Sequence, residues 1–306
     1  MGKIAFVFSG QGAQYSGMGK SLYDTSAAAK KLYDEAEILR EGTKAQSFSG
    51  TDDELKITKN TQPCLYLVDL SAAQALTENG VKADGVAGFS LGEVAALAYA
   101  GAYSNADGFK IVTKRGELMN DAGGDADTSM CAVLKLDSET IAKKASEYEK
   151  LYAVNFNSPG QTVVSGLSES VEKFSEEITE MGARCIPLNV SAAFHSPFMK
   201  DAAKKFDKAL CEFDIEKPEI PVYANLTAKP YGEDVKETLE KQIVSPVRWQ
   251  ETIENMIKDG YTDFVEVGAG KTLCGLIKKI SKDVSVYNVQ DEESLKITVE
   301  ALSERN

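Results

Sequence analysis

A serine between two glycines is the residue of this chain best placed for nucleophilic chemistry. Residues 88–92 read Gly-Phe-Ser-Leu-Gly, and the Gly-x-Ser-x-Gly pattern is typical of a serine held on a sharp strand-to-helix turn. A serine hydroxyl becomes a good nucleophile when a base removes its proton, and histidine titrates nearest to neutral pH. The chain has one histidine, His195. The sequence therefore predicts that Ser90 is a nucleophile and that His195 is its base.

The segments around Ser90 predict the elements that such a turn requires. Apolar residues recur at helical spacing before it, with Pro63 expected in the first turn of that helix and Asn79-Gly80 at its end. Residues 85–89 then read as a short buried strand, and residues 91–101 as an alanine-rich helix. An ordinary strand-to-helix turn with an idle serine is the alternative, because the pentapeptide alone is weak evidence.

Composition and charge narrow the classes of function. A chain of 306 residues with 43% apolar and 26% charged residues is typical of a globular protein with one large α/β domain or two smaller ones. A formal net charge of −13 disfavours nucleic acid and anionic membranes as partners. Five cysteines without a Cys-x-x-Cys pair predict reduced thiols and a cytoplasmic location, and one histidine makes a metal site unexpected. No segment has the length of a membrane span or the pattern of a signal peptide.

The order of predicted elements divides the chain into a discontinuous core and an insertion. Residues 123–193 predict the order β-α-β-β-α-β, which is the ferredoxin-like arrangement, with a helix over residues 138–150 and a last strand over residues 184–190. Strands and helices alternate on both sides of this segment, as expected for a parallel α/β core, and one of these strands is expected over residues 221–226. The predicted domains are therefore a core of residues 1–122 and 194–306 and an inserted subdomain of residues 123–193. Ser90 precedes the insertion and His195 follows it.

Three glycine turns are similar to nucleotide-binding loops but lack a required glycine. They are residues 10–12, 19–21 and 270–272. The required glycines are replaced by Tyr15, Gln14 and Val265, respectively. We therefore expect no bound nucleotide cofactor, and we interpret residues 10–12 as a tight turn whose backbone N–H groups can face a ligand.

Seven short motifs occur in a fixed order along almost the whole chain. They are residues 6–14, 88–93, 115–119, 155–161, 193–196, Gln242 with 245–249, and 266–271. In this order they resemble the motifs of the malonyl-CoA:acyl carrier protein transacylases of fatty acid and polyketide synthesis. The resemblance implies a parallel α/β-hydrolase-like core with a ferredoxin-like insertion, in agreement with the pattern of elements.

The resemblance implies how a thioester would be attacked. Ser90 would attack the malonyl thioester of coenzyme A, with His195 as its base. The backbone N–H groups of Gln11 and Leu91 would hold the oxyanion. The backbone carbonyl of Gln242 would orient the imidazole in place of the usual carboxylate. Without the motif, Gln242 reads as an ordinary helix-end glutamine.

The resemblance also implies the substrate and the partners. Arg115 would bind the free carboxylate of the malonyl group through a bidentate pair, although a lone helical arginine is more often solvated or paired at a surface. The malonyl group would move through an ester on Ser90 to the pantetheine thiol of holo-acyl carrier protein. The implied partners are malonyl-CoA, as a coenzyme A thioester substrate, and the carrier protein. No permanently bound cofactor is expected.

Two positions depart from the usual family pattern, and a third bears on the substrate. Phe89 stands where the family usually has histidine, which leaves no rival to His195 as the base. Ala269 replaces a frequent proline. Phe194 would crowd an α-methyl group, which favours malonyl over methylmalonyl.

Other functions remain open at this stage. They are a free-standing polyketide acyltransferase, an editing acyl hydrolase, an esterase with a third acidic triad member, and an inactive scaffold that binds carrier protein. The scaffold predicts loss of Ser90 or His195, and both are present.

Overall fold

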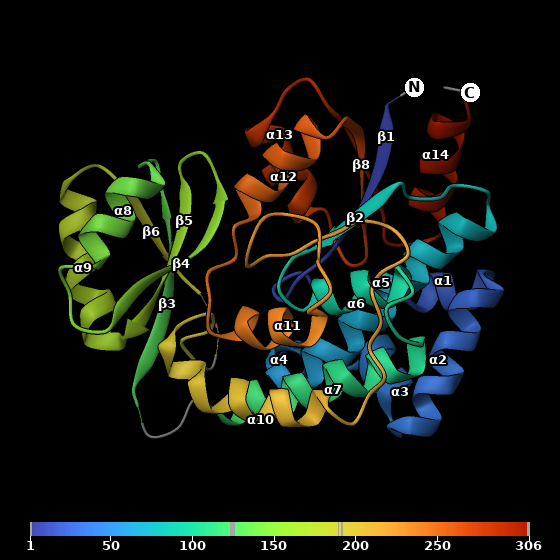
Figure 1. Cartoon of the computed structure of the whole chain (residues 1–306), viewed down its shortest axis with the longest axis horizontal. Coiled ribbons are helices and arrows are strands. Elements are labelled where there is room, and N and C mark those ends of the chain that lie inside the picture. The colour runs from blue at the N-terminus through green and yellow to red at the C-terminus, as the bar shows by residue number, and fades with distance from the viewer. Residues whose placement is uncertain (1, 123–125, 189, 191, 305–306) are drawn as a thin grey trace.

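Two β-sheets organise the computed structural model, which describes residues 2–122, 126–188, 190 and 192–304 (Figure 1). The larger sheet has the strand order β7-β2-β1-β8-β9, and every neighbouring pair is parallel. Its strands are β1 (Lys3–Phe8), β2 (Gly85–Gly88), β7 (Val222–Tyr223), β8 (Tyr261–Val267) and β9 (Ser285–Val289). The predicted α/β class with a parallel sheet is therefore confirmed.

Both faces of the larger sheet are covered by helices, because successive side chains of a strand point to opposite faces. In β1, Phe6 and Phe8 lie in one apolar cluster, whereas Ala5 and Val7 lie in another. The second cluster includes α12 (Trp249–Lys258) and α13 (Thr272–Ile280). The first includes residues of α1 (Lys20–Thr25), α2 (Ala27–Leu39), α5 (Thr58–Glu78), α6 (Gly92–Tyr99), α7 (Asn105–Asp121), α10 (Lys200–Leu210), α11 (Val235–Ile243) and α14 (Glu292–Ser303).

Two short helices, α3 (Thr43–Ser49) and α4 (Asp52–Lys56), precede α5, and the short helix η1 (Pro197–Met199) precedes α10. Within the described ranges, no helix combines the length and the apolar character needed to cross a bilayer.

The smaller sheet is antiparallel and lies beside the core, with two helices on its outer face (Figure 1). Its elements follow the order β-α-β-β-α-β, and its strand order is β4-β5-β3-β6. They are β3 (Thr128–Leu134), α8 (Ser138–Ala145), β4 (Leu151–Ser158), β5 (Gln161–Leu167), α9 (Ser168–Glu180) and β6 (Arg184–Pro187). Part of the linker expected before β3, residues 123–125, lies outside the described residues.

Some predicted boundaries were wrong. Pro63 is not in the first turn of α5, because the carbonyl of Ile57 already accepts the N–H groups of Asn60 and Thr61 and starts the helix earlier. The strand expected over residues 221–226 ends at Tyr223, because the chain turns back and Tyr231 donates its N–H to the carbonyl of Val222.

The helix expected over residues 138–150 and the strand expected over residues 184–190 are also shorter than predicted. The helix ends at Ala145, where a turn of two i→i−3 bonds follows, with Glu147 N–H to Lys144 and Tyr148 N–H to Ala145. The strand ends at Pro187. Leu188 still donates its N–H to the carbonyl of Met130 at 2.9 Å, but Val190 then donates its N–H to Leu188 instead of to β3.

A short segment after α11 joins the two sheets. Val247 donates its N–H to the carbonyl of Val154 at 2.8 Å and accepts the N–H of Phe156 at 2.9 Å. Both partners belong to β4, so residues 245–248 run beside this strand as a parallel bridge. The segment around Val247 therefore hydrogen-bonds the smaller sheet to the core.

Candidate active site

Ser90 lies at the carboxyl end of β2, on the turn that leads into α6. Its backbone has φ of 55°, a left-handed conformation that is uncommon for residues other than glycine. The flanking glycines make this turn possible. A Cβ on Gly88 would lie 2.0 Å from the carbonyl carbon of Gly92, and a Cβ on Gly92 would lie 2.4 Å from the carbonyl oxygen of Phe8. The sequence pattern therefore corresponds to a strained turn, as expected for a nucleophile.

His195 lies directly against Ser90. Its Nε2 is 2.7 Å from Ser90 Oγ, and its Nδ1 is 3.0 Å from the backbone carbonyl oxygen of Gln242. Because a carbonyl can only accept, Nδ1 carries the proton and donates it to Gln242. Nε2 is then free to accept the Ser90 hydroxyl proton. The structure therefore brings Ser90, His195 and Gln242 together in the predicted order, and the acceptor at Nδ1 is a carbonyl rather than a carboxylate.

The surroundings of His195 keep the imidazole neutral. Burial and, to a smaller extent, the positive charge of Arg115 lower the pKa of His195 to about 4. The hydrogen bond to the carbonyl of Gln242 opposes this shift. At neutral pH the side chain is therefore unprotonated and can accept a proton from Ser90.

Arg115 projects from α7 into the same site and is completely buried. Nη1 donates to Gln62 Oε1 at 2.9 Å, and Nη2 donates to Gln242 Oε1 at 2.8 Å and to Ser90 Oγ at 3.2 Å. Nε has no partner, and no carboxylate of the described residues forms an ion pair with this guanidinium. Burial lowers the pKa of Arg115 to about 10, so the group remains a cation at neutral pH. Glu93, which is also buried, favours this charge without forming an ion pair, so the guanidinium is available to an anionic ligand.

The two predicted oxyanion donors also lie at this site. Gln11 follows β1 and Leu91 follows Ser90, and β1 pairs with β2 so that Phe8 lies opposite Gly88. Gln11 and Leu91 both line the cavity that contains Ser90. Within the described chain neither backbone N–H has a hydrogen-bond acceptor, whereas the N–H of Ser90 is bound by Asn225 Oδ1 at 2.8 Å.

The cavity beside Ser90 continues into a larger one. The inner cavity, about 80 Å³, includes Ser90, Arg115 and His195. The outer cavity, about 210 Å³, shares four lining residues with it and reaches the gap between the two sheets. The shared residues are Gln11, Phe89, Asn155 and Leu188.

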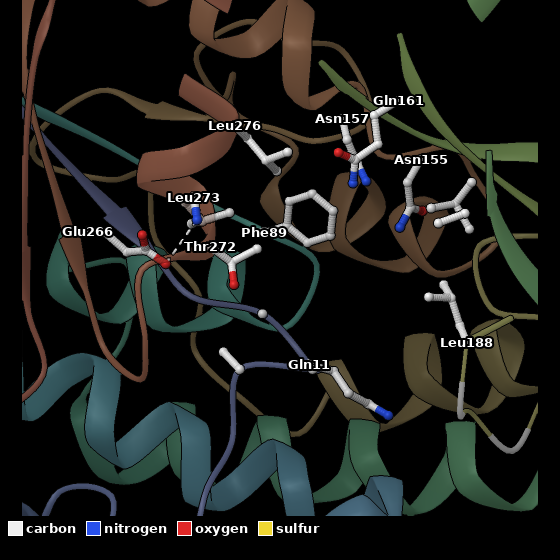
Figure 2. Close-up of a pocket in the computed structure, with 15 residues that line it drawn as sticks. Gln11, Phe89, Asn155, Asn157, Gln161, Leu188, Glu266, Thr272, Leu273 and Leu276 are labelled. Carbon is white, nitrogen blue, oxygen red and sulfur yellow. Dashed lines mark hydrogen bonds between the residues drawn. The ribbon is translucent and has the colours of Figure 1, made fainter. Parts of the chain in front are cut away.

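The outer cavity has a polar side and an apolar side (Figure 2). The amide groups of Asn155, Asn157 and Gln161 come from the smaller sheet, and Leu273 and Leu276 of α13 lie across from them. The Oδ1 atoms of Asn155 and Asn157 are buried and have no partner among the described residues. These two amide side chains therefore leave unsatisfied acceptors beside the cavity.

Several site residues were not predicted from the sequence. Gln62 holds Arg115, and Asn225 binds the turn that carries Ser90. A glutamine inside a helix and an asparagine after a strand carry no local signal of such contacts. Phe89, the departure from the family pattern, packs edge-on against Trp249 with ring centroids 5.5 Å apart.

The family model for the acyl transferase domain matches residues 5–296. The chain belongs to the acyl transferase family. A relative in this family, the malonyl CoA-acyl carrier protein transacylase of Bacillus subtilis (strain 168), is 42% identical over 315 residues, which cover 100% of this chain and 99% of the relative. The resemblance drawn from the seven motifs is thereby confirmed.

Solved structures of the acyl transferase family share the fold. The crystal structure of malonyl CoA-acyl carrier protein transacylase from Clostridium perfringens matches with a TM-score of 0.95 and 38% identity, over 99% of this chain and 98% of that one. A second structure is described as a type II PKS acyl-carrier protein in complex with its malonyl-transacylase. It matches with a TM-score of 0.94 and 34% identity, over 98% of this chain and 99% of that one.

Proposed function

We propose that this acyltransferase moves a malonyl group from malonyl-CoA to the pantetheine thiol of holo-acyl carrier protein. One observation carries the substrate assignment. The buried guanidinium of Arg115 has no ion-pair partner among the described residues and donates to Ser90 Oγ at 3.2 Å. A malonyl thioester has a free carboxylate one methylene group away from its reacting carbonyl, and a bidentate pair with Arg115 would satisfy both charges.

In the first half-reaction, Ser90 Oγ attacks the thioester carbonyl while its proton moves to His195 Nε2. The backbone N–H groups of Gln11 and Leu91 stabilise the oxyanion, and each such donor is typically worth about 3–4 kcal/mol. The C–S bond then breaks. The imidazolium gives its proton to the departing coenzyme A thiolate, and a malonyl ester remains on Ser90.

In the second half-reaction, His195 removes the proton of the carrier protein's pantetheine thiol. The thiolate attacks the ester carbonyl, and the same two N–H groups stabilise the oxyanion. The ester C–O bond breaks, and Ser90 Oγ takes back the proton from His195. Coenzyme A enters as a thioester substrate, and no step needs a permanently bound cofactor.

We assign the outer cavity to the pantetheine arm, which both substrates share. The arm has two amide groups on an otherwise aliphatic chain, and the cavity has amide side chains on one wall and leucines on the other. The unpaired oxygens of Asn155 and Asn157 would accept the N–H groups of the arm.

We also propose that the core is α/β-hydrolase-like, comprising residues 1–122 and 194–306, and that residues 123–193 form a ferredoxin-like subdomain. The strand order β4-β5-β3-β6 and the position of Ser90 after β2 support this. A cytoplasmic location stays a prediction, in keeping with five free cysteines.

Fatty acid synthesis is the proposed pathway, on the strength of the family resemblance. A polyketide pathway is the second candidate, because a structural neighbour is described as the malonyl-transacylase of a type II PKS carrier protein. An editing hydrolase would have little use for Arg115. The carbonyl acceptor at His195 Nδ1 argues against an esterase with an acidic third triad member.

Intact mass spectrometry tests the proposal. Mixing the protein with malonyl-CoA should give a malonyl adduct that disappears when holo-carrier protein is added. Ser90→Ala should give no adduct, because the attacking oxygen is missing. An adduct that clears equally fast without carrier protein would indicate a hydrolase, and an undiminished adduct on Ser90→Ala would exclude Ser90 as the nucleophile.

A further inference from the structure

We propose that Asn225 is a positioning residue that fixes the peptide groups around Ser90 and thereby orients Ser90 Oγ for attack. Asn225 lies just beyond β7 and is fully buried. Its Oδ1 accepts the N–H of Ser90 at 2.8 Å, and its Nδ2 donates to the carbonyl of Gly88 at 2.7 Å. The inference deepens the proposed function, on which it rests.

These two hydrogen bonds continue the parallel sheet with a side chain. Strands β2 and β7 pair through Val86 with Val222 and through Ala87 with Tyr223, and the regular ladder ends there. The next groups along β2 are the carbonyl of Gly88 and the N–H of Ser90, on either side of Phe89. The Asn225 amide binds both as a neighbouring backbone would, because it offers one donor and one acceptor in one plane.

Asn225 is itself held firmly from two sides. Its backbone N–H donates to Glu93 Oε2 at 2.9 Å, and its carbonyl accepts the N–H of Arg248 at 3.1 Å. Glu93 is fully buried and also accepts hydrogen bonds from the Tyr231 hydroxyl and from Gln242 Nε2. The carboxylate therefore anchors the segment that carries Asn225.

The Ser90 peptide is thus fixed at both ends. Asn225 binds its N–H, and Gln242 Nε2 donates to its carbonyl at 2.9 Å. These bonds hold a backbone with φ of 55° in the orientation that places Oγ 2.7 Å from His195 Nε2. They also occupy the Ser90 N–H, which leaves the N–H groups of Leu91 and Gln11 as the proposed oxyanion donors.

Asn225 lines neither cavity itself and makes no hydrogen bond to Arg115. It meets the inner cavity only through the backbone of Ser90, so its loss should affect attack rather than binding. For Asn225→Ala we expect kcat for malonyl transfer to fall by about 100-fold, as for a misplaced reacting group, with KM for malonyl-CoA within twofold of wild type. The second-order rate of Ser90 labelling by a small uncharged fluorophosphonate should fall similarly. This reagent needs neither Arg115 nor the pantetheine cavity.

Asn225→Asp gives a readout that a merely structural residue would not produce. An ionised carboxylate can accept the N–H of Ser90 but cannot donate to the carbonyl of Gly88, whereas a protonated carboxyl can do both. Burial should keep the proton on the new carboxyl group of this variant at mildly acidic pH. Glu93, whose own pKa burial raises to about 7, is protonated there and adds a negative charge only as pH rises. We expect fluorophosphonate labelling of Asn225→Asp to approach the wild-type rate toward pH 5 and to fall behind it as pH rises.

Asn255→Ala is the matched control. Asn255 Nδ2 donates to the carbonyl of Ala228 at 2.9 Å, in the turn that follows Asn225, and makes no contact with the turn at Ser90. This variant should keep wild-type kcat and labelling. If wild-type protein forms no malonyl adduct, the proposed function fails. If wild type is active but Asn225→Ala labels at the wild-type rate, or Asn225→Asp shows the wild-type pH profile, the positioning role is overturned.

Discussion

The base and the cation of the site affect each other directly. Arg115 contacts Ser90 Oγ, and its charge contributes to the low pKa of His195. A bound malonyl carboxylate would neutralise that charge and make the imidazole more basic when acylation begins. The free site therefore holds its base in the unprotonated form, and the substrate strengthens it.

The single histidine allows this interaction to be measured directly by NMR. The imidazole Cε1–H resonance of wild-type protein should titrate with a pKa of about 4. Arg115→Gln should raise this pKa, because it removes a positive charge. A wild-type pKa of 6 or above would show that the imidazole is more hydrated than the structure indicates.

The low pKa of His195 in the folded protein also determines how the free energy of unfolding changes with pH. The pKa of the imidazole is near 6.5 in the unfolded chain and about 4 in the folded one. Between these two pH values the unfolded chain therefore binds more protons than the folded chain. The contribution of His195 to stability is therefore complete above about pH 6.5 and is lost as pH falls toward 4. In urea titrations at these pH values, a variant with His195→Gln should lose less stability on acidification than wild type.

Arg115 should decide which acyl groups are transferred. Truncating one partner of a buried charge pair costs about 2–5 kcal/mol, which is roughly 30-fold to several-thousand-fold. Arg115→Ala should lower kcat/KM for malonyl-CoA by this factor and preserve transfer from acetyl-CoA. Arg115→Lys should not restore the ratio, because a point charge lacks the planar fork. Arg248→Ala is the control, because its side chain pairs with Glu251 at the surface. An unchanged malonyl-to-acetyl ratio in Arg115→Ala would contradict the substrate assignment.

At the scale of elements, the close approach of α6 to β1 depends on Gly92. An added Cβ would meet the carbonyl oxygens of Phe8 and Ser9 at 2.4 and 2.5 Å, and backbone atoms cannot move aside easily. Gly92→Ala should therefore destabilise the protein by about 1–3 kcal/mol in urea unfolding and reduce activity. Gly275→Ala in α13, where nothing lies within 4 Å of the added Cβ, should be neutral or stabilising. Equal effects of the two variants would contradict this reading of the turn.

The sequence predicts elements well where local pattern decides them. The strand at Gly85–Gly88 and the helix at Gly92–Tyr99 follow from local pattern, and Ser90 and His195 stood out because one lies in a recognisable motif and the other is the single histidine. The contacts of Gln62 and Asn225 could not be predicted in this way. Each depends on packing between segments distant in the sequence, since Gln62 meets Arg115 and Asn225 meets Ser90.

At the scale of the whole molecule, the net charge of −13 opposes docking of an acidic carrier protein. A local basic surface must offset this repulsion. Lys278 and Lys279 in the last turn of α13 form no ion pair with any described residue, and Lys279 Nζ donates to Gln161 at the outer cavity. Lys271 directly precedes this helix. Gln161 and Thr272, which follows Lys271, line the proposed pantetheine site, whereas Lys278 Nζ donates to the carbonyl of Val284. Lys200, Lys204 and Lys205 lie on the separate helix α10.

Charge reversal of Lys271, Lys278 and Lys279 should raise KM for carrier protein and leave the rate of Ser90 acylation by malonyl-CoA almost unchanged, because rim charges act mainly on encounter. Both half-reactions are measured separately by rapid mixing. The same change at Lys296, which pairs with Glu292 on α14, should have no effect. Equal damage to both half-reactions would assign the lysines to coenzyme A or to stability, and an effect only at the α10 lysines would move the docking surface there.

The bridge at Val247 links one wall of the outer cavity to the segment that orients the base. Val247 is bonded to β4, whose residues form the polar wall of the outer cavity, and five residues earlier the carbonyl of Gln242 orients His195. If the smaller sheet swung outward to admit a bulkier acyl chain, it would pull on this short segment and tilt the imidazole away from Ser90. Exclusion of oversized substrates would then operate mechanically, through a misaligned proton acceptor. In native-state hydrogen exchange, the amides of Phe156 and Val247 should exchange at the same rate. Conditions that speed this exchange should lower the rate at which Ser90 is labelled. Independent exchange of the two amides would contradict this coupling. Concerted exchange would mean that the enzyme discriminates acyl groups by size before the ester on Ser90 forms.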